Sequence, residues 1–167
     1  MLDTARRLLD EEGVEGLTLG RVARELGIKT PSLYKHFTGK RQLEALLIAD
    51  GLRSHAEVLE ATRPDLGSIA AAYRAFALEN PHLYRLMTDR PLPRDELPAG
   101  LEARAAAPLL RALGDPDLAR AAWAYAHGMV QLELAGRFPA DADLDAAWSK
   151  AIRALQNAAE GVSHPRE

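Results

Sequence analysis

Apolar residues recur along this chain at the three- and four-residue spacing of amphipathic helices, and glycines and prolines separate the resulting segments. The first segment, residues 2–12, carries one apolar face and is stopped by Gly13 and Gly16. Further helices are predicted between Thr18 and Gly27 and over residues 30–37, 40–62, 68–80, 81–88, 101–113, 116–137 and 141–160, with a proline-rich loop at 89–100. The expected fold class is all-α.

Composition supports this expectation and removes several classes of function. Ala and Leu supply 58 residues while Val and Ile supply only 9, which favours helices over strands. The absence of cysteine excludes disulfides, thiol catalysis and cysteine-ligated metals. The first residues lack the apolar stretch of a signal peptide, and the most apolar stretch, residues 118–130, is interrupted by charge. A cytoplasmic protein of one or two small domains is expected.

The basic charge of the chain is local. The formal net charge is −3, which by itself argues against a nucleic-acid partner. Residues 20–41, however, contain six cations and one anion, whereas residues 53–167 contain 13 cations and 16 anions. The position of this cationic segment directs attention to the two short helices within it.

These two helices, joined by the turn at residues 27–29, form a helix-turn-helix pattern. Thr18 suits the N-cap of the first, and Leu17 and Val22 have the spacing of a hydrophobic staple. On the second, Leu33 and Phe37 should point inward. The outward face then carries small, hydroxylated and cationic groups suited to a major groove: Thr30, Pro31, Ser32 and Lys35, flanked by Tyr34 and His36.

The next helix opens with two cations, Lys40 and Arg41. The macrodipole disfavours cations in a first turn, and a bound phosphate would offset that cost. The alternative interpretation is that the charges form an ordinary solvated face on a helical scaffold. On charge and spacing alone, DNA binding and this alternative both stay open.

Residues 17–43 resemble the DNA-binding domain of the TetR (tetracycline-repressor-like) family of bacterial transcription regulators. The matching positions are Thr18, Val22, Ala23, Leu26, Gly27, Ile28, Leu33, Tyr34, His36, Phe37, Lys40 and Leu43. The resemblance implies a DNA-binding domain over residues 1–45, with a recognition helix and Lys40 as a backbone anchor. The DNA-binding residues are then expected to be Thr18, Lys29, Thr30, Pro31, Ser32, Tyr34, Lys35, His36 and Lys40.

The second half resembles a subgroup of this family with a Trp-x-x-x-His-Gly element, here Trp123, His127 and Gly128. The resemblance implies that residues 46–167 bind an effector and form the dimer. An apolar cluster with a few polar tips suits a small-molecule site. The expected pocket residues are Tyr73, Phe76, His82, Tyr84, Met87, Trp123 and His127.

The helix predicted over residues 116–137 is apolar nearly all round, so both its sides must be covered. One side can pack on its own chain and the other on a partner, which gives a four-helix interface when the last helix joins it. The residues expected in this homodimer interface are Leu118, Ala122, Tyr125, Met129, Leu132, Leu144, Trp148, Ile152 and Leu155.

The sequence contains none of the common motifs for catalysis or metal binding. No nucleophile elbow, zinc-protease motif or Gly-rich phosphate loop is present. Asp141, Asp143 and Asp145 resemble the start of a calcium loop, but Ala146 and Ile152 stand where Gly and Glu are needed. No catalytic residue, metal or cofactor is therefore expected.

The expected function is that of a transcriptional repressor, released from a palindromic operator by a small-molecule effector. Members of the family usually carry several further residues, often basic, before the point in the first helix at which this sequence begins. A helical small-molecule-binding protein that has lost DNA binding is therefore the alternative, and a helical enzyme using the C-terminal cavity is a third hypothesis.

Overall fold

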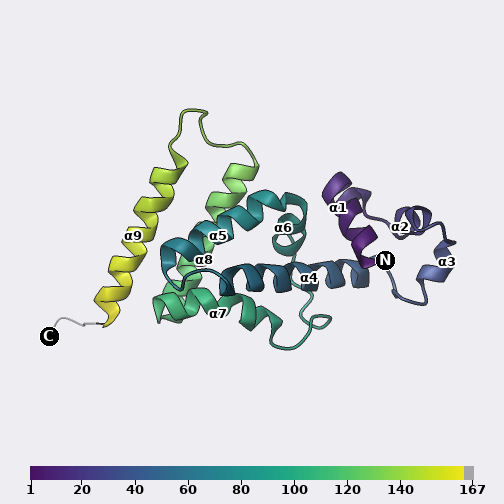
Figure 1. Cartoon of the computed structure of the whole chain (residues 1–167), viewed down its shortest axis with the longest axis horizontal. Helices are drawn as coiled ribbons and strands as arrows, with labels where there is room; N and C mark the ends of the chain where they lie inside the picture. Colours follow the sequence, from purple (N-terminus) through teal and green to yellow (C-terminus); the bar gives the residue numbers. More distant parts are fainter. Residues whose placement is uncertain (164–167) are drawn as a thin grey trace. The chain divides into compact units, whose positions relative to one another are not determined.

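The computed structural model describes residues 1–163, and nine helices without any strand account for the regular structure of that range (Figure 1). All-α architecture is thus confirmed. None of these helices is long and apolar enough to cross a membrane. The helices are α1 (Leu2–Gly16), α2 (Leu19–Glu25), α3 (Thr30–Leu33), α4 (Lys40–Glu60), α5 (Leu66–Glu79), α6 (Pro81–Thr88), α7 (Leu101–Leu113), α8 (Pro116–Leu134) and α9 (Leu144–Ser163).

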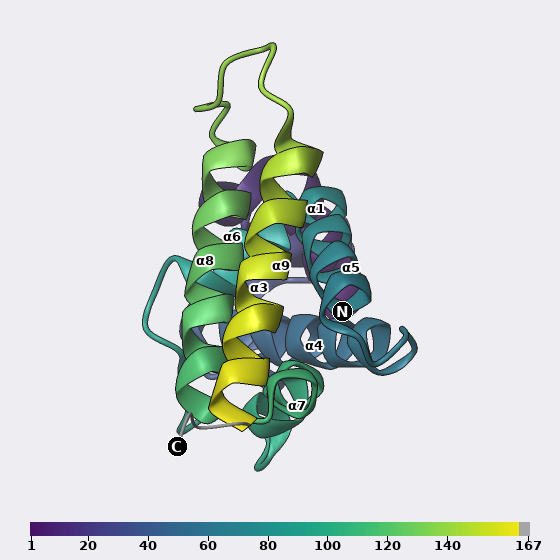
Figure 2. The ribbon, with the colours of Figure 1, turned by 90° about the vertical axis from the view of Figure 1, so that its left-hand side faces the viewer.

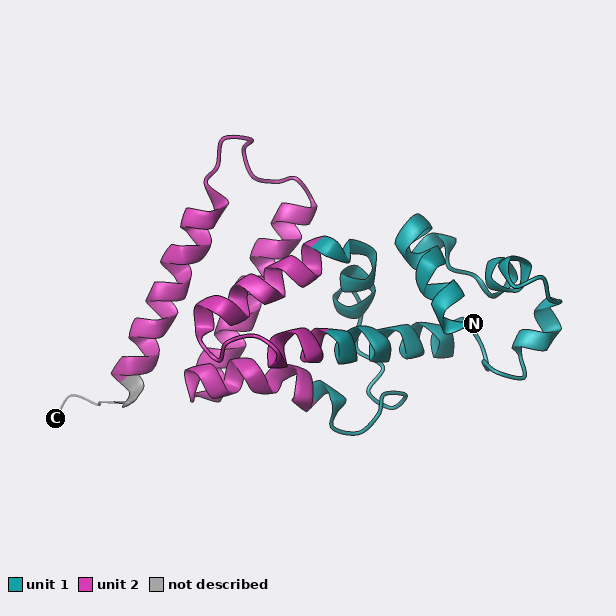
Figure 3. Cartoon of the chain, in the orientation of Figure 1, with its two compact units in different colours: residues 1–54, 79–102 teal, residues 55–78, 103–167 magenta. Residues whose placement is uncertain are grey.

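The chain divides into two compact units (Figure 3). Unit 1 contains residues 1–54 and 79–102, and unit 2 contains residues 55–78 and the chain from residue 103 onward. Helices α4 and α7 each supply residues to both units. The functional boundary between residues 45 and 46 stays a prediction, because compactness alone does not assign function.

Unit 1 has a core of fully buried aliphatic side chains drawn from five helices and from the turn between α1 and α2. Helix α1 packs on α2 and α6, and α2 packs on α3. Gly13, with φ of 71°, interrupts α1 where the sequence predicts a stop, and one further turn follows it. The core residues with least exposure are Leu8, Leu9, Leu17, Val22, Leu33, Leu43, Leu47 and Leu83.

Helices α4 and α6 approach each other closely within unit 1. A Cβ atom at Gly51 would lie 2.6 Å from Sδ of Met87 and 3.1 Å from the methyl carbons of Leu83. A side chain at residue 51 would therefore force the side chains of Met87 and Leu83 to shift, because close-packed interiors do not absorb added methylenes without strain. This packing accounts for the position of Met87, which was predicted to line a pocket.

Unit 2 contains α5, most of α7, α8 and α9, with α8 and α9 side by side (Figure 2). Arg74 of α5 connects them: its guanidinium pairs with Glu133 at 2.8 Å and with Asp145 at 2.5 Å and lies 5.7 Å from the ring centre of Trp148. The indole N–H of Trp148 donates to Oε1 of Glu133 at 2.7 Å. The buried carboxylate of Glu133 thus has two donors.

Several helix boundaries differ from the sequence-based expectation, and hydrogen bonds or backbone conformation at the helix ends explain three of them. Helix α5 begins at Leu66 rather than residue 68, because the Asp65 carboxylate accepts from the Ser68 N–H at 2.8 Å. Helix α8 ends at Leu134 rather than residue 137, since Gly136 adopts φ of 60°. Helix α9 begins at Leu144 rather than residue 141, because Asp143, not Asp141, accepts from the first-turn N–H of Ala146 at 2.9 Å.

Candidate nucleic-acid interface

The turn between α2 and α3 is set by local hydrogen bonds. Thr18 caps α2 as predicted, its hydroxyl accepting from the Arg21 N–H at 3.2 Å. At the other end, Gly27 adopts φ of 66°, and the N–H of Ile28 donates to the carbonyl of Ala23 at 3.0 Å. This six-to-one bond is the Schellman ending, which requires a left-handed residue and so favours glycine. The sequence thereby fixes where the chain turns toward α3.

Helix α3 is shorter than expected. The α-helix covers Thr30–Leu33 and not residues 30–37. Beyond it the chain tightens: the N–H of Lys35 donates to Ser32 at 3.4 Å and that of His36 to Leu33 at 2.8 Å, both to the carbonyl three residues back. Such tightening is common where a helix ends. The turn brings Phe37 into the core, where its side chain is 5% exposed.

Leu33 and Phe37 are buried as the sequence predicts, and this directs the intervening side chains outward. Tyr34 is 58% exposed. Thr30 is half-buried at the start of the helix. The other residues of the predicted reading face are exposed, namely Thr18, Lys29, Pro31, Ser32, Lys35 and His36. Hydroxyl, ammonium, phenol and imidazole groups therefore share one surface, and all of them can donate to phosphates or base edges.

Lys40, the predicted phosphate anchor, also has partners within the chain. Its Nζ donates to the carbonyl of Val14 at 3.1 Å and lies 3.7 Å from Oε1 of Glu44. The first contact ties α4 to the end of α1, and the side chain stays 40% exposed. An ammonium group has three donors, so these contacts leave Lys40 able to reach a phosphate.

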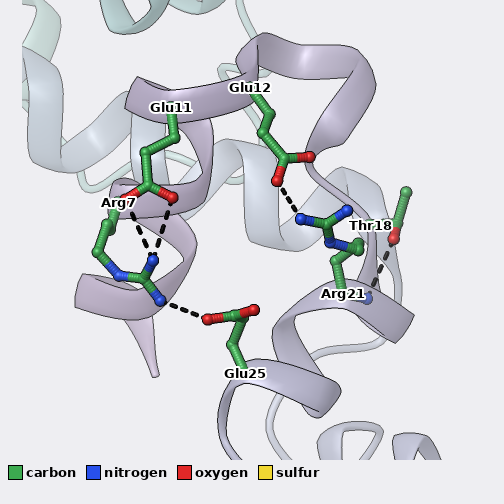
Figure 4. Close-up of polar contacts among 6 residues, drawn as sticks. All are labelled: Arg7, Glu11, Glu12, Thr18, Arg21 and Glu25. Carbon is green, nitrogen blue, oxygen red and sulfur yellow. Dashed lines mark hydrogen bonds and ion pairs between the residues drawn. The ribbon is translucent and has the colours of Figure 1, made fainter.

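Ion pairs connect α1 with α2 (Figure 4). Arg7 pairs with Glu11 at 3.1 Å and with Glu25 of α2 at 2.7 Å, and Arg21 pairs with Glu12. The hydrogen bond from Arg7 holds the pKa of Glu25 below its usual value. Arg7 and Arg21 thus join α1 to α2, whereas Lys29 and Lys35 are exposed at the α3 surface and the Lys40 side chain stays 40% exposed at the start of α4.

The predicted effector-pocket residues fall into both units. In unit 2, Tyr73 and Phe76 are buried on α5. Trp123 on α8 is 52% exposed, and its ring stacks on His127 with centroids 6.0 Å apart. In unit 1, α6 carries buried Tyr84, together with Met87 and His82.

His82 lines a pocket of about 270 Å³ in unit 1, at the junction of α1 and α6. Of the residues expected to bind an effector, only His82 contributes to it. The remaining lining residues are Val14, Glu15, Arg85, Leu86, Asp89 and Arg90.

His55 is a buried polar residue that the sequence-based reasoning missed. Its side chain is 9% exposed and lies edge-on to the rings of Tyr73 and Phe76, with centroids 5.3 and 5.0 Å away. Its Nε2 has no hydrogen-bond partner, and burial lowers the pKa of His55 to about 4. The signal was present, because His55 continues the buried stripe of Leu47, Gly51 and Leu59 at four-residue spacing.

The residues predicted at a dimer interface differ in exposure within the single chain. Trp148 and Ala122 are buried, at 5% and 4% exposed, whereas Leu132 is 44% exposed. Leu118, Ile152 and Leu155 pack on the cluster that contains Ala122. Tyr125, Met129 and Leu144 are half-buried, and burial together with Glu133 raises the pKa of Tyr125.

Comparison with known proteins decides the family. The family model described as "Bacterial regulatory proteins, tetR family" matches residues 1–46. A second family model, "Tetracyclin repressor-like, C-terminal domain", matches residues 66–155, which are more than half of the chain. The chain belongs to the TetR family of bacterial transcriptional regulators. The family expected from residues 17–43 is thus confirmed, and the chain is a DNA-binding regulator rather than an enzyme. The Trp-x-x-x-His-Gly subgroup stays a prediction.

Relatives and solved structures agree with this assignment. Rv0681, an HTH-type transcriptional regulator of Mycobacterium tuberculosis, is 30% identical over 170 residues, which span 93% of this chain and 78% of the relative. The regulatory protein SCO4313 superimposes with a TM-score of 0.74 at 27% identity, covering 92% of each chain. A TetR variant from Acinetobacter baumannii AYE in complex with minocycline gives a TM-score of 0.68 at 25% identity, covering 96% of this chain and 94% of the other.

The burial of His55 predicts a pH dependence of folding in this TetR protein. Its pKa is about 4 in the folded chain, against about 6.5 for an unperturbed histidine. Between these values the unfolded chain binds more protons, so stability is lost as the pH falls, at up to about 1.4 kcal/mol per pH unit from this group. Urea unfolding between pH 7.5 and 5, at fixed protein concentration, measures the slope.

His55→Phe should flatten that slope relative to the unsubstituted protein, since the variant has no imidazole to protonate. His36→Gln is the matched control, because it removes an exposed histidine and should leave the slope unchanged. An equal pH dependence in His55→Phe and the parent protein would contradict the role given to buried His55.

Proposed function

We propose that this TetR-family chain is a homodimeric repressor that acts in the cytoplasm and leaves a palindromic operator when a small molecule binds. The observation that carries the proposal is the exposure of Ser32, Tyr34 and Lys35 around the buried residues Leu33 and Phe37. Side chains of this kind can read base edges in a major groove. Helix α4, the next helix along the chain, begins with Lys40, which would contact a phosphate.

For the effector site, we infer a pocket that uses His55 with Tyr73 and Phe76. A buried polar atom without a partner costs free energy, and a hydrogen-bonding ligand would remove that cost. His55 Nε2 is such an atom, and the aromatic rings supply the apolar lining typical of small-molecule sites. The minocycline complex of a structural neighbour supports ligand binding within this fold.

Repression and release can be coupled through a conformational equilibrium. An effector shifts that equilibrium only as far as its affinities for the two conformations differ, typically by about 1 to 3 kcal/mol. Helix α4 is the proposed lever, because it begins with Lys40 and continues without interruption to His55 and Glu60. Binding at His55 can therefore bias the helix that carries the phosphate anchor.

The proposed dimer uses α8 and α9 of each chain. The face of α8 opposite its buried residues carries exposed Leu132 together with Ala121, Ala124 and Gly128. A Cβ atom built at Gly128 meets nothing within 4 Å, so the chain itself leaves this surface open. Small residues there permit the close approach of a partner helix, and twofold symmetry would bring the same two helices together.

DNA binding separates the roles of two lysines. Lys40→Ala should weaken binding to a selected operator and to mixed-sequence duplex by the same factor, because phosphate contacts carry no sequence information. Lys35→Ala should weaken operator binding more, lowering the ratio of the two affinities by about 5- to 100-fold, the range of a base contact. Fluorescence anisotropy at one fixed salt concentration measures both affinities.

Lys150→Ala removes the same charge from the exposed surface of α9 and should change neither affinity. Thermal melting of each variant confirms that the fold persists, which matters for Lys40 because it also bonds to Val14. Failure of the parent protein to bind any DNA would favour the small-molecule-binding alternative. Identical losses for Lys35→Ala and Lys40→Ala on both duplexes would contradict the division into reading and anchoring residues.

The dimer makes a separate prediction. Leu132→Asp should yield monomers, because the partner would bury an unpaired carboxylate, at a cost of several kcal/mol. Leu78→Asp changes a similarly exposed leucine on α5 and should leave the dimer intact. Trp148→Asp cannot distinguish loss of the dimer from loss of the fold, since Trp148 is buried in its own chain and donates a hydrogen bond to Glu133. Sedimentation velocity gives the masses, and a stable Leu132→Asp dimer would rule out this interface.

A further inference from the structure

The second cation at the start of α4, Arg41, has no role in the interface described so far. Its side chain is 70% exposed. The guanidinium lies between two carboxylates, with Nη2 2.9 Å from Oδ2 of Asp95 and Nε 2.5 Å from Oε1 of Glu96. All three residues belong to unit 1. The macrodipole disfavours a cation in the first turn of a helix, and these two carboxylates offset that cost within the chain.

Both carboxylates come from one turn of the loop at residues 89–100. The N–H of Glu96 donates to the carbonyl of Pro93 at 2.9 Å, which closes the turn and places Asp95 and Glu96 next to each other. Arg94, the residue before Asp95, makes two hydrogen bonds to Glu102 of α7, at 2.7 and 2.8 Å. The turn is therefore held to the start of α7.

The same loop contacts α4 a second time. Arg90 lies 3.8 Å from Oε1 of Glu44, whose side chain is only 15% exposed and which also lies 3.7 Å from Lys40. The loop thus places a cation against Glu44 and two anions against Arg41. This arrangement neutralises charge at the end of α4 that carries the proposed phosphate anchor.

We propose that Arg41 is a second phosphate-binding residue and that Asp95 and Glu96 form an acidic latch, which holds it until DNA competes. The inference rests on the proposed DNA-binding function. Exposed ion pairs are weak and screened by salt, so a phosphate can replace the carboxylates on Arg41. Arginine suits the exchange because its planar fork binds carboxylate and phosphate in the same two-point geometry. The loop at residues 89–100 thereby sets how many cations each protomer offers to DNA.

A double-mutant cycle tests the latch. D95N/E96Q removes both charges while keeping similar side-chain shapes, and it should bind mixed-sequence duplex about three- to tenfold more tightly at low salt. The slope of log affinity against log salt should steepen by about one per protomer, as expected for one more phosphate neutralised. In an R41Q background, the same two substitutions should give no gain, because the cation that they release is absent.

The control variant is E57Q, which removes one negative charge from the exposed surface of α4, outside the loop that carries Asp95 and Glu96. It should alter affinity less than twofold. Circular dichroism melts check that each variant folds, which is expected because the pairs at Arg41 are exposed.

Each outcome of the cycle decides the proposal. A gain in D95N/E96Q that persists with R41Q would mean that the acids repel DNA directly, and it would overturn the latch. Absence of any gain, with normal binding by the parent protein, would also overturn the latch while leaving the proposed function intact. Absence of DNA binding in the parent protein and in all variants would reject both the function and the latch.

Discussion

A helix of four residues cannot keep its shape in water, so the surface offered by α3 depends on the burial of Leu33 and Phe37. Both side chains are buried, as are Val22 and Ala23 of α2, the helix on which α3 packs. Fully burying an aliphatic or aromatic side chain contributes about 1.5 to 3 kcal/mol, which is more than one helical turn supplies. The reading face is therefore a consequence of packing, and of its side chains Thr18 also supports the fold, because its hydroxyl caps α2.

Some cations around that face stabilise the fold, and others are exposed to a DNA partner. Arg7 and Arg21 bind carboxylates that join α1 to α2, and Lys40 bonds to Val14 at the end of α1. Lys29 and Lys35 are exposed on the surface itself. A chain of net charge −3 can bind DNA on these terms, because local cations act within about a Debye length and more distant acidic residues are screened.

The sequence predicted best those features that neighbouring residues determine. Thr18 and Gly27 marked the ends of α2, since capping and left-handed turns depend on one or two residues. The predicted length of α3 was wrong because the spacing of its apolar residues also suits a longer helix. In the structure, the chain tightens after Leu33 and so buries Phe37. The partners of Arg41 could not be predicted, since Asp95 and Glu96 lie more than fifty residues away. The burial of His55 could have been predicted from its place on the buried stripe of α4. The lack of a hydrogen-bond partner for its Nε2 could not, because it depends on which residues of other helices surround the imidazole.

The central claim is that two copies of the α3 surface, related by twofold symmetry, read two half-sites on one face of the duplex. The most direct measurement inserts about five base pairs, half a helical turn, between the half-sites of an operator selected from random DNA. The account predicts loss of tight binding, because the half-sites then lie on opposite faces of the duplex. Unchanged affinity, with a footprint over one asymmetric half-site, would contradict it.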